Sequence, residues 1–327
     1  MIELRDDALE FKFAEVHKDA TLRIGFQRTL RIPDDGATYH LPPGLGHFPL
    51  AHVDDHADRV PASWLDHGGV ILPMYQSEAM WIHFWGTYPC AVKIAAGMIN
   101  AVTGEPWRTG LHRGPQDYVV TDSQPWLDGF CVEKGIIRQF VAAPLGSGHT
   151  AEEQLTGVAA HGGLQVAVIP LRAEAYARYL EKRISDESRY VLYCKSRTEM
   201  GLGAGGRMRQ EIYTDTFKLE DWDTAHACRC FVHIANSLAW KRLTGLVAPP
   251  TPITAKAYSQ HGLPWFDYYA SDQIALPGSA TLAGLQSVGA LSMAKGNPLA
   301  DNEPIVPPQV ITLSKHTAPR FVRETGA

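Results

Sequence analysis

The segment from Asp221 to Gly245 constrains the fold most, because its boundaries and its periodicity are both typical of one long helix. Asp221 and Asp223 are good N-cap residues, and Lys241 and Arg242 complement the negative end of a helix dipole. Gly245 can adopt the left-handed conformation that ends many helices. Apolar residues, spaced at about 100° each, cover most of the cylinder. We therefore expect a largely buried helix over residues 221–245, lying across a sheet.

One face of this expected helix carries His226, Cys230 and His233 at positions i, i+4 and i+7. Side chains at this spacing lie close together, and imidazole and thiolate groups are the ligands that zinc prefers. The sequence shows three of the four ligands that a structural zinc site needs. In the alternative interpretation, the histidines hydrogen-bond to neighbouring loops and Cys230 is a small core residue.

A second group of possible metal ligands occurs in the run His52-Val-Asp54-Asp55-His56. His52, Asp54 and His56 have the residue types of a two-histidine, one-carboxylate iron site, and zinc also binds such a set. The alternative is a solvated acidic turn before Pro61. A divalent metal, zinc or iron, is thus a possible cofactor, and the sequence leaves open whether either group binds it.

Strand patterns dominate the N-terminal half. Apolar and polar residues alternate in two places between residues 10 and 26, which predicts half-buried strands. The segment from Gly68 to Val102 contains three apolar runs that we interpret as consecutive strands of a central sheet. Trp81, His83 and Trp85 share one face of the middle strand. That face is an aromatic platform with a titratable group if it lines a cleft, and His83 is a core histidine if it is packed.

The middle of the chain gives two helix signals and one further strand. Thr150 and Glu153 form a capping-box pattern that begins a short helix. Residues 172–184 have helical spacing of apolar and charged groups, which predicts an amphipathic helix, and residues 189–195 are typical of a strand.

A glycine-rich run, Gly201-x-Gly203-x-x-Gly206, has the spacing of a dinucleotide-binding loop. The residues after it alternate like a strand instead of opening a helix that would bind a pyrophosphate. We therefore predict no nucleotide site here.

Candidate residues for ligand binding or catalysis are scattered along the chain. Arg207 and Arg209 project from one face of the expected strand, and Arg138 lies on the strand 136–141. His149 follows a Gly-rich turn whose backbone NH groups can bind an anion. Paired guanidinium groups hold carboxylates or phosphates. With His233, these residues form the site that we expect to orient or titrate against a small polar or anionic ligand.

The composition excludes several classes of protein. The formal net charge is -5 with no cluster of Lys or Arg, which argues against nucleic-acid binding. No apolar run approaches the roughly 20 residues that cross a bilayer, and the first residues lack the pattern of a signal peptide. Five cysteines without framework spacing suit a reducing compartment. We expect no membrane contact and a cytoplasmic protein.

These observations predict an α+β fold with a largely antiparallel, sandwich-like β core, a C-terminal helical layer and Pro/Gly-rich loops. We divide the chain into a β-rich core (1–171), a helix-strand-helix layer (172–246) and a Pro/Gly-rich wrapping segment (247–327), which together form one compact unit.

Three functions stay open. The leading one is an enzyme or binder for a small polar or anionic molecule in a cleft between the β-rich half and the helix layer. The second is a non-catalytic homo-oligomeric assembly protein that associates through its C-terminal segment. The third is a metal-dependent oxidase or hydrolase.

Overall fold

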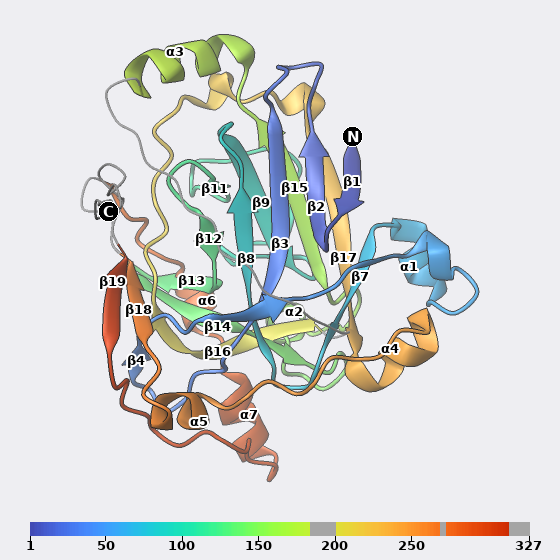
Figure 1. The fold of residues 1–327 in the computed structure, drawn as a ribbon, viewed down its shortest axis with the longest axis vertical. Coiled ribbons are helices and arrows are strands. Elements are labelled where there is room, and N and C mark those ends of the chain that lie inside the picture. The colour runs from blue at the N-terminus through green and yellow to red at the C-terminus, as the bar shows by residue number, and fades with distance from the viewer. Residues whose placement is uncertain (184–200, 269–272, 314–327) are drawn as a thin grey trace, which may run out of the picture.

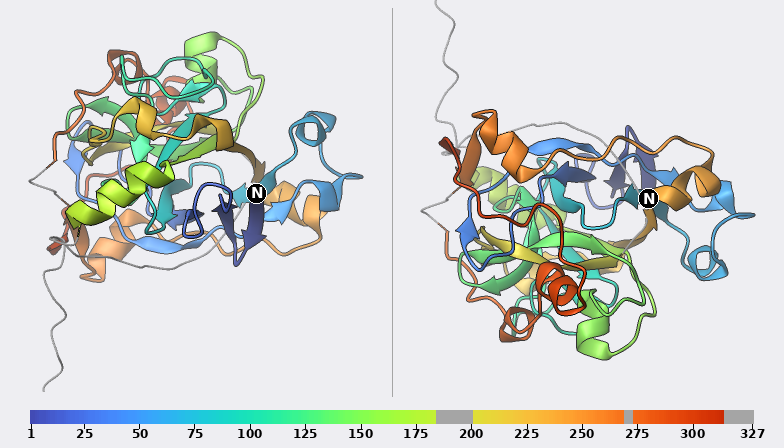
Figure 2. Two further views of the ribbon diagram at one scale, coloured as in Figure 1. Left: turned by 90° about the horizontal axis from the view of Figure 1, so that it is seen from above. Right: turned by 90° about the horizontal axis from the view of Figure 1, so that it is seen from below.

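Two large, mostly antiparallel sheets pack face to face, with short helices around their ends (Figure 1). The structure is a computed structural model and describes residues 1–183, 201–268 and 273–313. The expected α+β class, with a sandwich-like antiparallel core, is confirmed. Viewed from above and below, the two sheets form adjacent layers, and α1 and α4 project together from one end (Figure 2).

The first sheet has ten strands in the described residues and runs in the order β1-β2-β3-β8-β14-β16-β4, with β5, β12 and β13 paired at its sides. β4 pairs in parallel with β16, and the other pairs are antiparallel. The bounds of these strands are β1 (Ile2–Arg5), β2 (Ala8–Lys12), β3 (Thr21–Thr29), β4 (Thr38–Tyr39), β5 (Gly44–His47), β8 (Ala79–Trp85), β12 (Trp126–Leu127), β13 (Gly129–Glu133), β14 (Ile136–Ala143) and β16 (Gly201–Arg209).

The second sheet runs in the order β10-β9-β15-β17-β7-β6, with β11 paired to β9. A separate pair of parallel strands, β18 and β19, lies at the opposite side of the molecule from α1 (Figure 1). The bounds are β6 (Ala51–His52), β7 (Val70–Met74), β9 (Cys90–Ala96), β10 (Ile99–Asn100), β11 (Val119–Val120), β15 (Leu164–Pro170), β17 (Cys228–Asn236), β18 (Trp265–Tyr268) and β19 (Val310–Leu313).

The helices are short and lie outside the sheets. Their bounds are α1 (Ala62–His67), α2 (Ala151–Thr156), α3 (Ala173–Arg183), α4 (Ser237–Thr244), α5 (Ala255–Gln260), α6 (Ala280–Ala283) and α7 (Val288–Ala294), with 3-10 turns at Asp54–His56, Leu219–Asp221 and Thr224–His226. Within the described residues, no helix is long and apolar enough to cross a membrane.

The pairing of β3 with β8 fixes which residues enter the core between the sheets. Gly25 lies opposite His83 and Gln27 lies opposite Trp81, so these side chains share one face. The alternate residues, such as Ile24 and Ile82, are fully buried and join one hydrophobic cluster with residues of the second sheet. Burial of this cluster is the main force that holds the two sheets together.

The expected helix over residues 221–245 is wrong for most of its length. Residues 228–236 form β17, which lies between β15 and β7 in the second sheet, and of residues 221–245 only Ser237–Thr244 is α-helical. Two properties explain the error. Apolar residues on all sides suit a strand covered on both faces as well as a buried helix, and the run Phe-Val-His-Ile is rich in aromatic and β-branched side chains that favour strands.

The end of that segment behaves as expected. Asn236 caps α4 through a hydrogen bond from the backbone NH of Leu238, and Gly245 adopts a left-handed φ of 76°. Lys241 and Arg242 lie in the last turn.

The three apolar runs between Gly68 and Val102 are strands, as predicted, but they do not form one sheet. β7 and β9 belong to the second sheet and β8 belongs to the first. Periodicity marks a strand without specifying its partner, because pairing depends on contacts distant in sequence.

Other local predictions are confirmed. α3 covers residues 173–183, and Thr150 and Glu153 form the capping box of α2. The glycine-rich run at residues 201–206 is itself the first part of the strand β16, whereas the sequence indicated a strand only in the residues after it. The predicted strand over 189–195 lies outside the described residues, and the division into three segments stays a prediction.

Steric crowding at Gly129 gives a test of the β13-β14 pairing. A Cβ atom at this position would lie 2.0 Å from the carbonyl oxygen of Arg138, so Gly129→Ala must displace a paired strand. We expect a loss of about 1–3 kcal/mol in the free energy of unfolding, measured by urea denaturation. Gly284→Ala is the control, because its Cβ would make only ordinary contacts. Equal stability of the two variants would contradict the described register.

Candidate functional site

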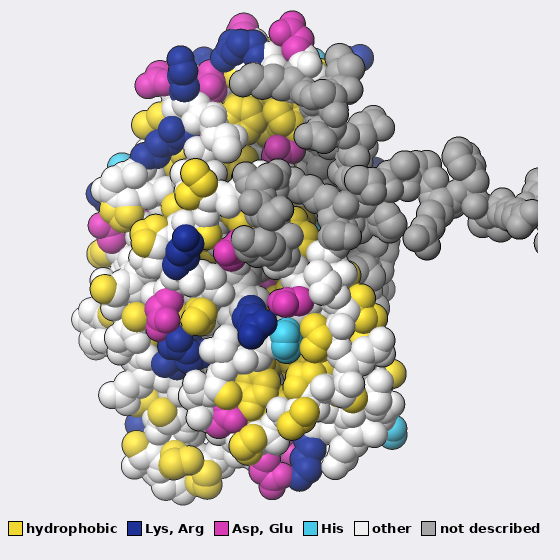
Figure 3. All heavy atoms as spheres, turned by 90° about the vertical axis from the view of Figure 1, so that its left-hand side faces the viewer, with side chains coloured by type: hydrophobic (Ala, Val, Ile, Leu, Met, Phe, Trp, Pro, Cys, Tyr) yellow, Lys and Arg dark blue, Asp and Glu magenta, His cyan; other side chains and the backbone are white. Residues whose placement is uncertain are grey.

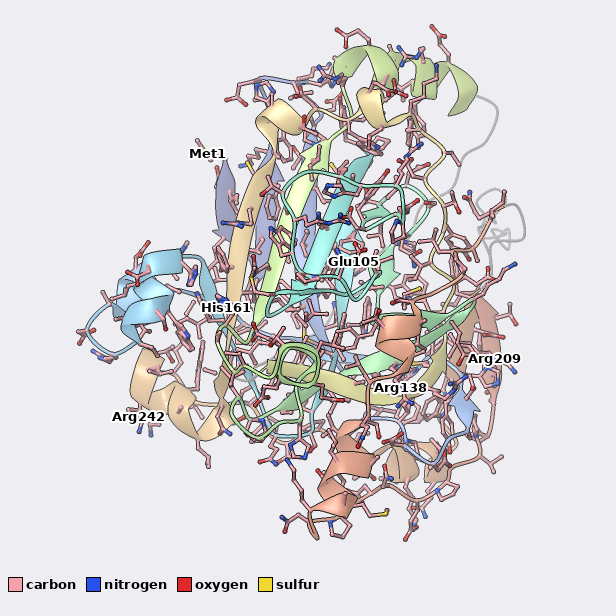
Figure 4. The ribbon with its side chains drawn as sticks, turned by 180° about the vertical axis from the view of Figure 1, so that it is seen from behind. Met1, Glu105, Arg138, His161, Arg209 and Arg242 are labelled. Carbon is pink, nitrogen blue, oxygen red and sulfur yellow. The ribbon has the colours of Figure 1, made fainter. Side chains whose placement is uncertain are left out.

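The five residues expected to form one ligand site lie in three separate places. Arg138 on β14 is the cross-strand neighbour of Arg207 on β16, and Arg209 follows on the same strand. His149 precedes α2, and His233 lies on β17. Figure 4 shows Arg138 and Arg209 toward the side of β18 and β19, well apart from the region of α1 and α4. The predicted cleft residues therefore do not converge.

Each of the three arginines has a carboxylate of the same chain beside it. Arg207 makes a two-pronged ion pair with Glu133, with N–O distances of 2.9 and 3.0 Å. Arg209 lies 3.7 Å from Asp267, and Arg138 lies 3.9 Å from Asp34. These carboxylates neutralise the positive charges that we expected to bind an anionic ligand.

His149 stabilises a turn. Its Nδ1 lies 3.0 Å from the carbonyl oxygen of Ser147 and 2.9 Å from the hydroxyl of the same residue. The backbone oxygen of His149 accepts a hydrogen bond from Gln154. Burial, with a contribution from the charge of Lys295, lowers the pKa of His149. These contacts account for the residue without a ligand.

The expected metal sites do not assemble in the described residues. His226 lies in a 3-10 turn and bonds Asp223, whereas Cys230 and His233, three apart on a strand, point to opposite faces. Burial raises the pKa of the Cys230 thiol to about 12, which disfavours the thiolate that binds metal.

The second expected metal site, at His52, Asp54 and His56, does not assemble either. His52 ends β6, and Asp54 and His56 lie in the following 3-10 turn. Across residues 1–183, 201–268 and 273–313, no group of three or more His, Cys, Asp or Glu side chains has metal-binding geometry.

His83 is a packed histidine. Its ring centroid lies 4.0 Å from that of Trp85 and 5.2 Å from that of Trp81, and only 6% of the residue is exposed. Burial, with a smaller effect of His47, lowers the pKa of His83 to about 3. The imidazole is therefore neutral at physiological pH.

A cavity of about 340 Å³ lies elsewhere, at one end of the first sheet. Residues 29 and 31, 75–79, 251–255 and 299–301 line it. The lining is rich in hydroxyl, amide and charged groups. Cavities that bind small ligands usually measure roughly 300–1,000 Å³, so this volume suits a small molecule.

Strand pairing and the C-terminal segment build this cavity together. Thr29 at the end of β3 lies opposite Ala79 at the start of β8, so the residues flanking both strands meet at one edge. Residues 249–255 cross that edge. The Tyr75 hydroxyl donates to the carbonyl of Pro249, and the Arg28 guanidinium donates to the carbonyl of Pro250 at 2.9 Å.

Glu78 is the buried acid of the cavity. One carboxylate oxygen accepts a hydrogen bond from Arg28, and the other accepts one from the backbone NH of Tyr75 at 2.9 Å. Burial raises the pKa of Glu78 to about 7, and the charge of Arg28 opposes that rise. Near neutral pH the carboxyl group is therefore close to half protonated.

Arg31 is the cation of the cavity, and its surroundings differ from those of the predicted arginines. Its guanidinium donates to the carbonyl oxygens of Ala300 at 2.6 Å and Asp301 at 3.5 Å, and to the side-chain oxygen of Asn302 at 3.1 Å. Within the described part of the chain, no carboxylate lies within ion-pair distance of Arg31. Burial lowers its pKa, and the nearby negative charges of Asp301 and Asp34 oppose that fall. The half-buried guanidinium thus hydrogen-bonds to neutral acceptors, with two carboxylates near it that do not contact it.

Sequence reasoning did not identify Arg28, Arg31 and Glu78 as parts of one site. Arginine at a strand end is an ordinary feature, and the residues that complete the cavity come from three other parts of the chain, 75–79, 251–255 and 299–301. No local signal identifies such a site.

Comparisons with known proteins add no assignment. No protein-family model matches the chain, and searches of curated proteins and of solved structures found no similar protein.

The raised pKa of Glu78 predicts how stability depends on pH. The folded state binds this proton more tightly than the unfolded state, whose carboxyl has a pKa near 4.5. The resulting stabilisation is fully present below pH 4.5 and is lost as the pH rises through about 7. It amounts to about 3 kcal/mol.

Urea denaturation between pH 4 and 8 measures this effect. We expect Glu78→Gln to remove the decline between pH 4.5 and 7, and Glu15→Gln, at an exposed site, to retain it. A decline of equal size in the Glu78→Gln variant would show that another group causes it.

Proposed function

We propose that this protein binds a small polar molecule with an anionic group, such as a carboxylate, in the cavity at Arg31 and Glu78. The observation that carries the proposal is a half-buried guanidinium, facing a cavity of about 340 Å³, whose described partners are neutral oxygens. A buried positive charge without a contacting carboxylate favours an anion, and a guanidinium can bind a carboxylate through two parallel hydrogen bonds.

The other groups in the cavity suit the rest of such a ligand. Ser77, Thr251 and the amide of Gln76 contribute hydrogen-bonding groups, whereas Ile253 and Leu299 contribute apolar surface. A few polar groups on a partly apolar wall are typical of small-molecule sites, because the polar groups orient the ligand while the apolar wall desolvates it.

Glu78 is a titratable group in the wall of the proposed site. A carboxyl group with a pKa near 7 can donate or accept a proton at physiological pH, which general acid-base catalysis requires. Arg28 holds the carboxyl in place. The cavity lies under residues 251–255 and 299–301, not in the expected cleft beside residues 172–246.

A thermal-shift screen of small carboxylates, paired with their neutral amides, tests the binding proposal. We expect at least one carboxylate to raise the melting temperature by a few degrees at millimolar concentration, since a ligand that binds only the folded state stabilises it. The matching amide should have little effect. Arg31→Met should abolish the shift, whereas Arg59→Met, at an exposed arginine outside the cavity, should retain it.

A second variant separates loss of the site from loss of stability. Thr251→Trp places a large side chain in the wall of the cavity without removing Arg31 or Glu78, and Thr109→Trp places the same side chain on another exposed loop. The proposal fails if no carboxylate stabilises the protein more than its amide, or if Thr251→Trp binds the ligand as tightly as Thr109→Trp.

A second candidate function, homo-oligomeric assembly through the C-terminal segment, has one observation in its favour. β19 is the outer strand of the β18-β19 pair in the described residues, and Val310 and Ile311 on it are each 38% exposed. The face that carries this pair mixes hydrophobic side chains with charges of both signs (Figure 3). Exposed strands with apolar side chains tend to associate.

Light scattering tests the assembly proposal. We expect the protein to be oligomeric and Ile311→Asp to shift it toward the monomer. Val306→Asp is the control, because Val306 is exposed in the same segment but lies outside the strand. A monomeric parent protein would contradict the proposal.

A further inference from the structure

A second, much smaller cavity lies between α1, the turn before β15 and β17. It measures about 20 Å³, which is enough for one water molecule or one bare ion. Three histidines line it, and they come from distant parts of the chain: His67, His161 and His233. Figure 4 shows His161 beside α1 and the ends of the strands. His233 thus does join other histidines, although not the ones that helical spacing paired with it.

Hydrogen bonds fix the tautomers of two of these rings. Nε2 of His233 lies 2.9 Å from the carbonyl oxygen of Gly68, and Nδ1 of His67 lies 2.6 Å from that of Ser63. A carbonyl only accepts hydrogen bonds, so both of these ring nitrogens carry hydrogen. The lone pairs are left on Nδ1 of His233 and Nε2 of His67.

This anchoring is what metal-binding histidines usually show. Such a ring donates its second N–H to a carbonyl or carboxylate, which fixes its tautomer and orientation. In the described contacts of the chain, neither lone pair accepts a hydrogen bond.

The separations between the rings suit an ion that has ligands on opposite sides. The centroids of His67 and His233 lie 6.4 Å apart, and those of His67 and His161 lie 6.1 Å apart. An imidazole nitrogen lies about 2 Å from a bound metal, so two rings on opposite sides of one ion have centroids about 6 Å apart. A tetrahedral ion such as zinc would need closer rings and four ligands. Copper(I) accepts two or three ligands at wide angles, and imidazole is a suitable ligand for copper.

We infer that His67 and His233 bind one copper(I) ion in this cavity. The inference agrees with the lack of a three-ligand group in the described residues, because two ligands on opposite sides suffice.

The surroundings favour a singly charged ion. Trp64 stacks on His233 with 4.7 Å between centroids, and Phe231 lies 4.5 Å from the ring of His67. His67 is exposed, so the ion is desolvated on one side only, and placing it against these aromatic rings costs less for one charge than for two. No carboxylate lines the cavity to offset a second charge.

Competition with a chromophoric chelator tests the site. The untagged protein is titrated anaerobically with copper(I) bicinchoninate, and we expect it to withdraw one equivalent of copper. His67→Gln and His233→Gln should each weaken binding by at least about tenfold, a loss that removal of even a supporting residue can cause. His52→Gln is the control, since His52 is exposed and lies outside the cavity. Circular dichroism and the melting temperature show whether each variant folds.

Nitrogen-15 NMR of the unmutated protein gives a result that does not depend on folding of the variants. Copper(I) is diamagnetic, so its binding should shift Nε2 of His67 and Nδ1 of His233 while the other nitrogen of each ring stays protonated. The inference is overturned if the protein withdraws no copper, if both variants bind as tightly as the parent, if His52→Gln loses binding equally, or if the shifts occur on other histidines. It is also overturned if zinc binds more tightly than copper at these two residues.

Discussion

The buried ion pair between Arg28 and Glu78 is the interaction on which the proposed site depends. Arg28 lies in β3 and Glu78 directly precedes β8, at the paired ends of these strands, and Arg28 also donates to the segment that covers the cavity. Removing one partner of a buried pair leaves an uncompensated charge, which usually costs about 3–5 kcal/mol. The same burial that makes the pair costly raises the pKa of Glu78 toward neutrality. Burial of this pair therefore determines both its contribution to stability and the raised pKa of Glu78.

The described arginines show how position decides whether a charge is available to a ligand. Arg138, Arg207 and Arg209 lie on adjacent strands, where Asp34, Glu133 and Asp267 lie beside them. Arg31 emerges at the end of β3, and the chain that meets it there supplies backbone and amide oxygens. A pairing with a carboxylate distant in sequence cannot be inferred from residue type, so the sequence pointed to the wrong cations.

The sequence predicted correctly those elements that depend on residues close together in the chain. The amphipathic spacing of 172–184 and the capping box at Thr150 depend on residues within a few positions, and both predictions are confirmed. Residues 228–236 show the limit, because an all-apolar segment suits a buried helix and a buried strand alike. Pairing with β15 and β7 makes this segment a strand. The wrong conformation also produced the wrong histidine cluster: the true neighbours of His233 are His67 and His161, which no spacing rule connects.

Direct titration of the Glu78 side-chain carboxyl by carbon-13 NMR, with and without a bound carboxylate ligand, is the most direct test of the account. We predict a midpoint near pH 7 in the free protein, because burial outweighs the charge of Arg28. A ligand anion at Arg31 should move it higher, since a nearby negative charge disfavours ionisation. A midpoint at or below the ordinary value of 4.5, unchanged by ligand, would contradict both the buried acid and the anion site beside it.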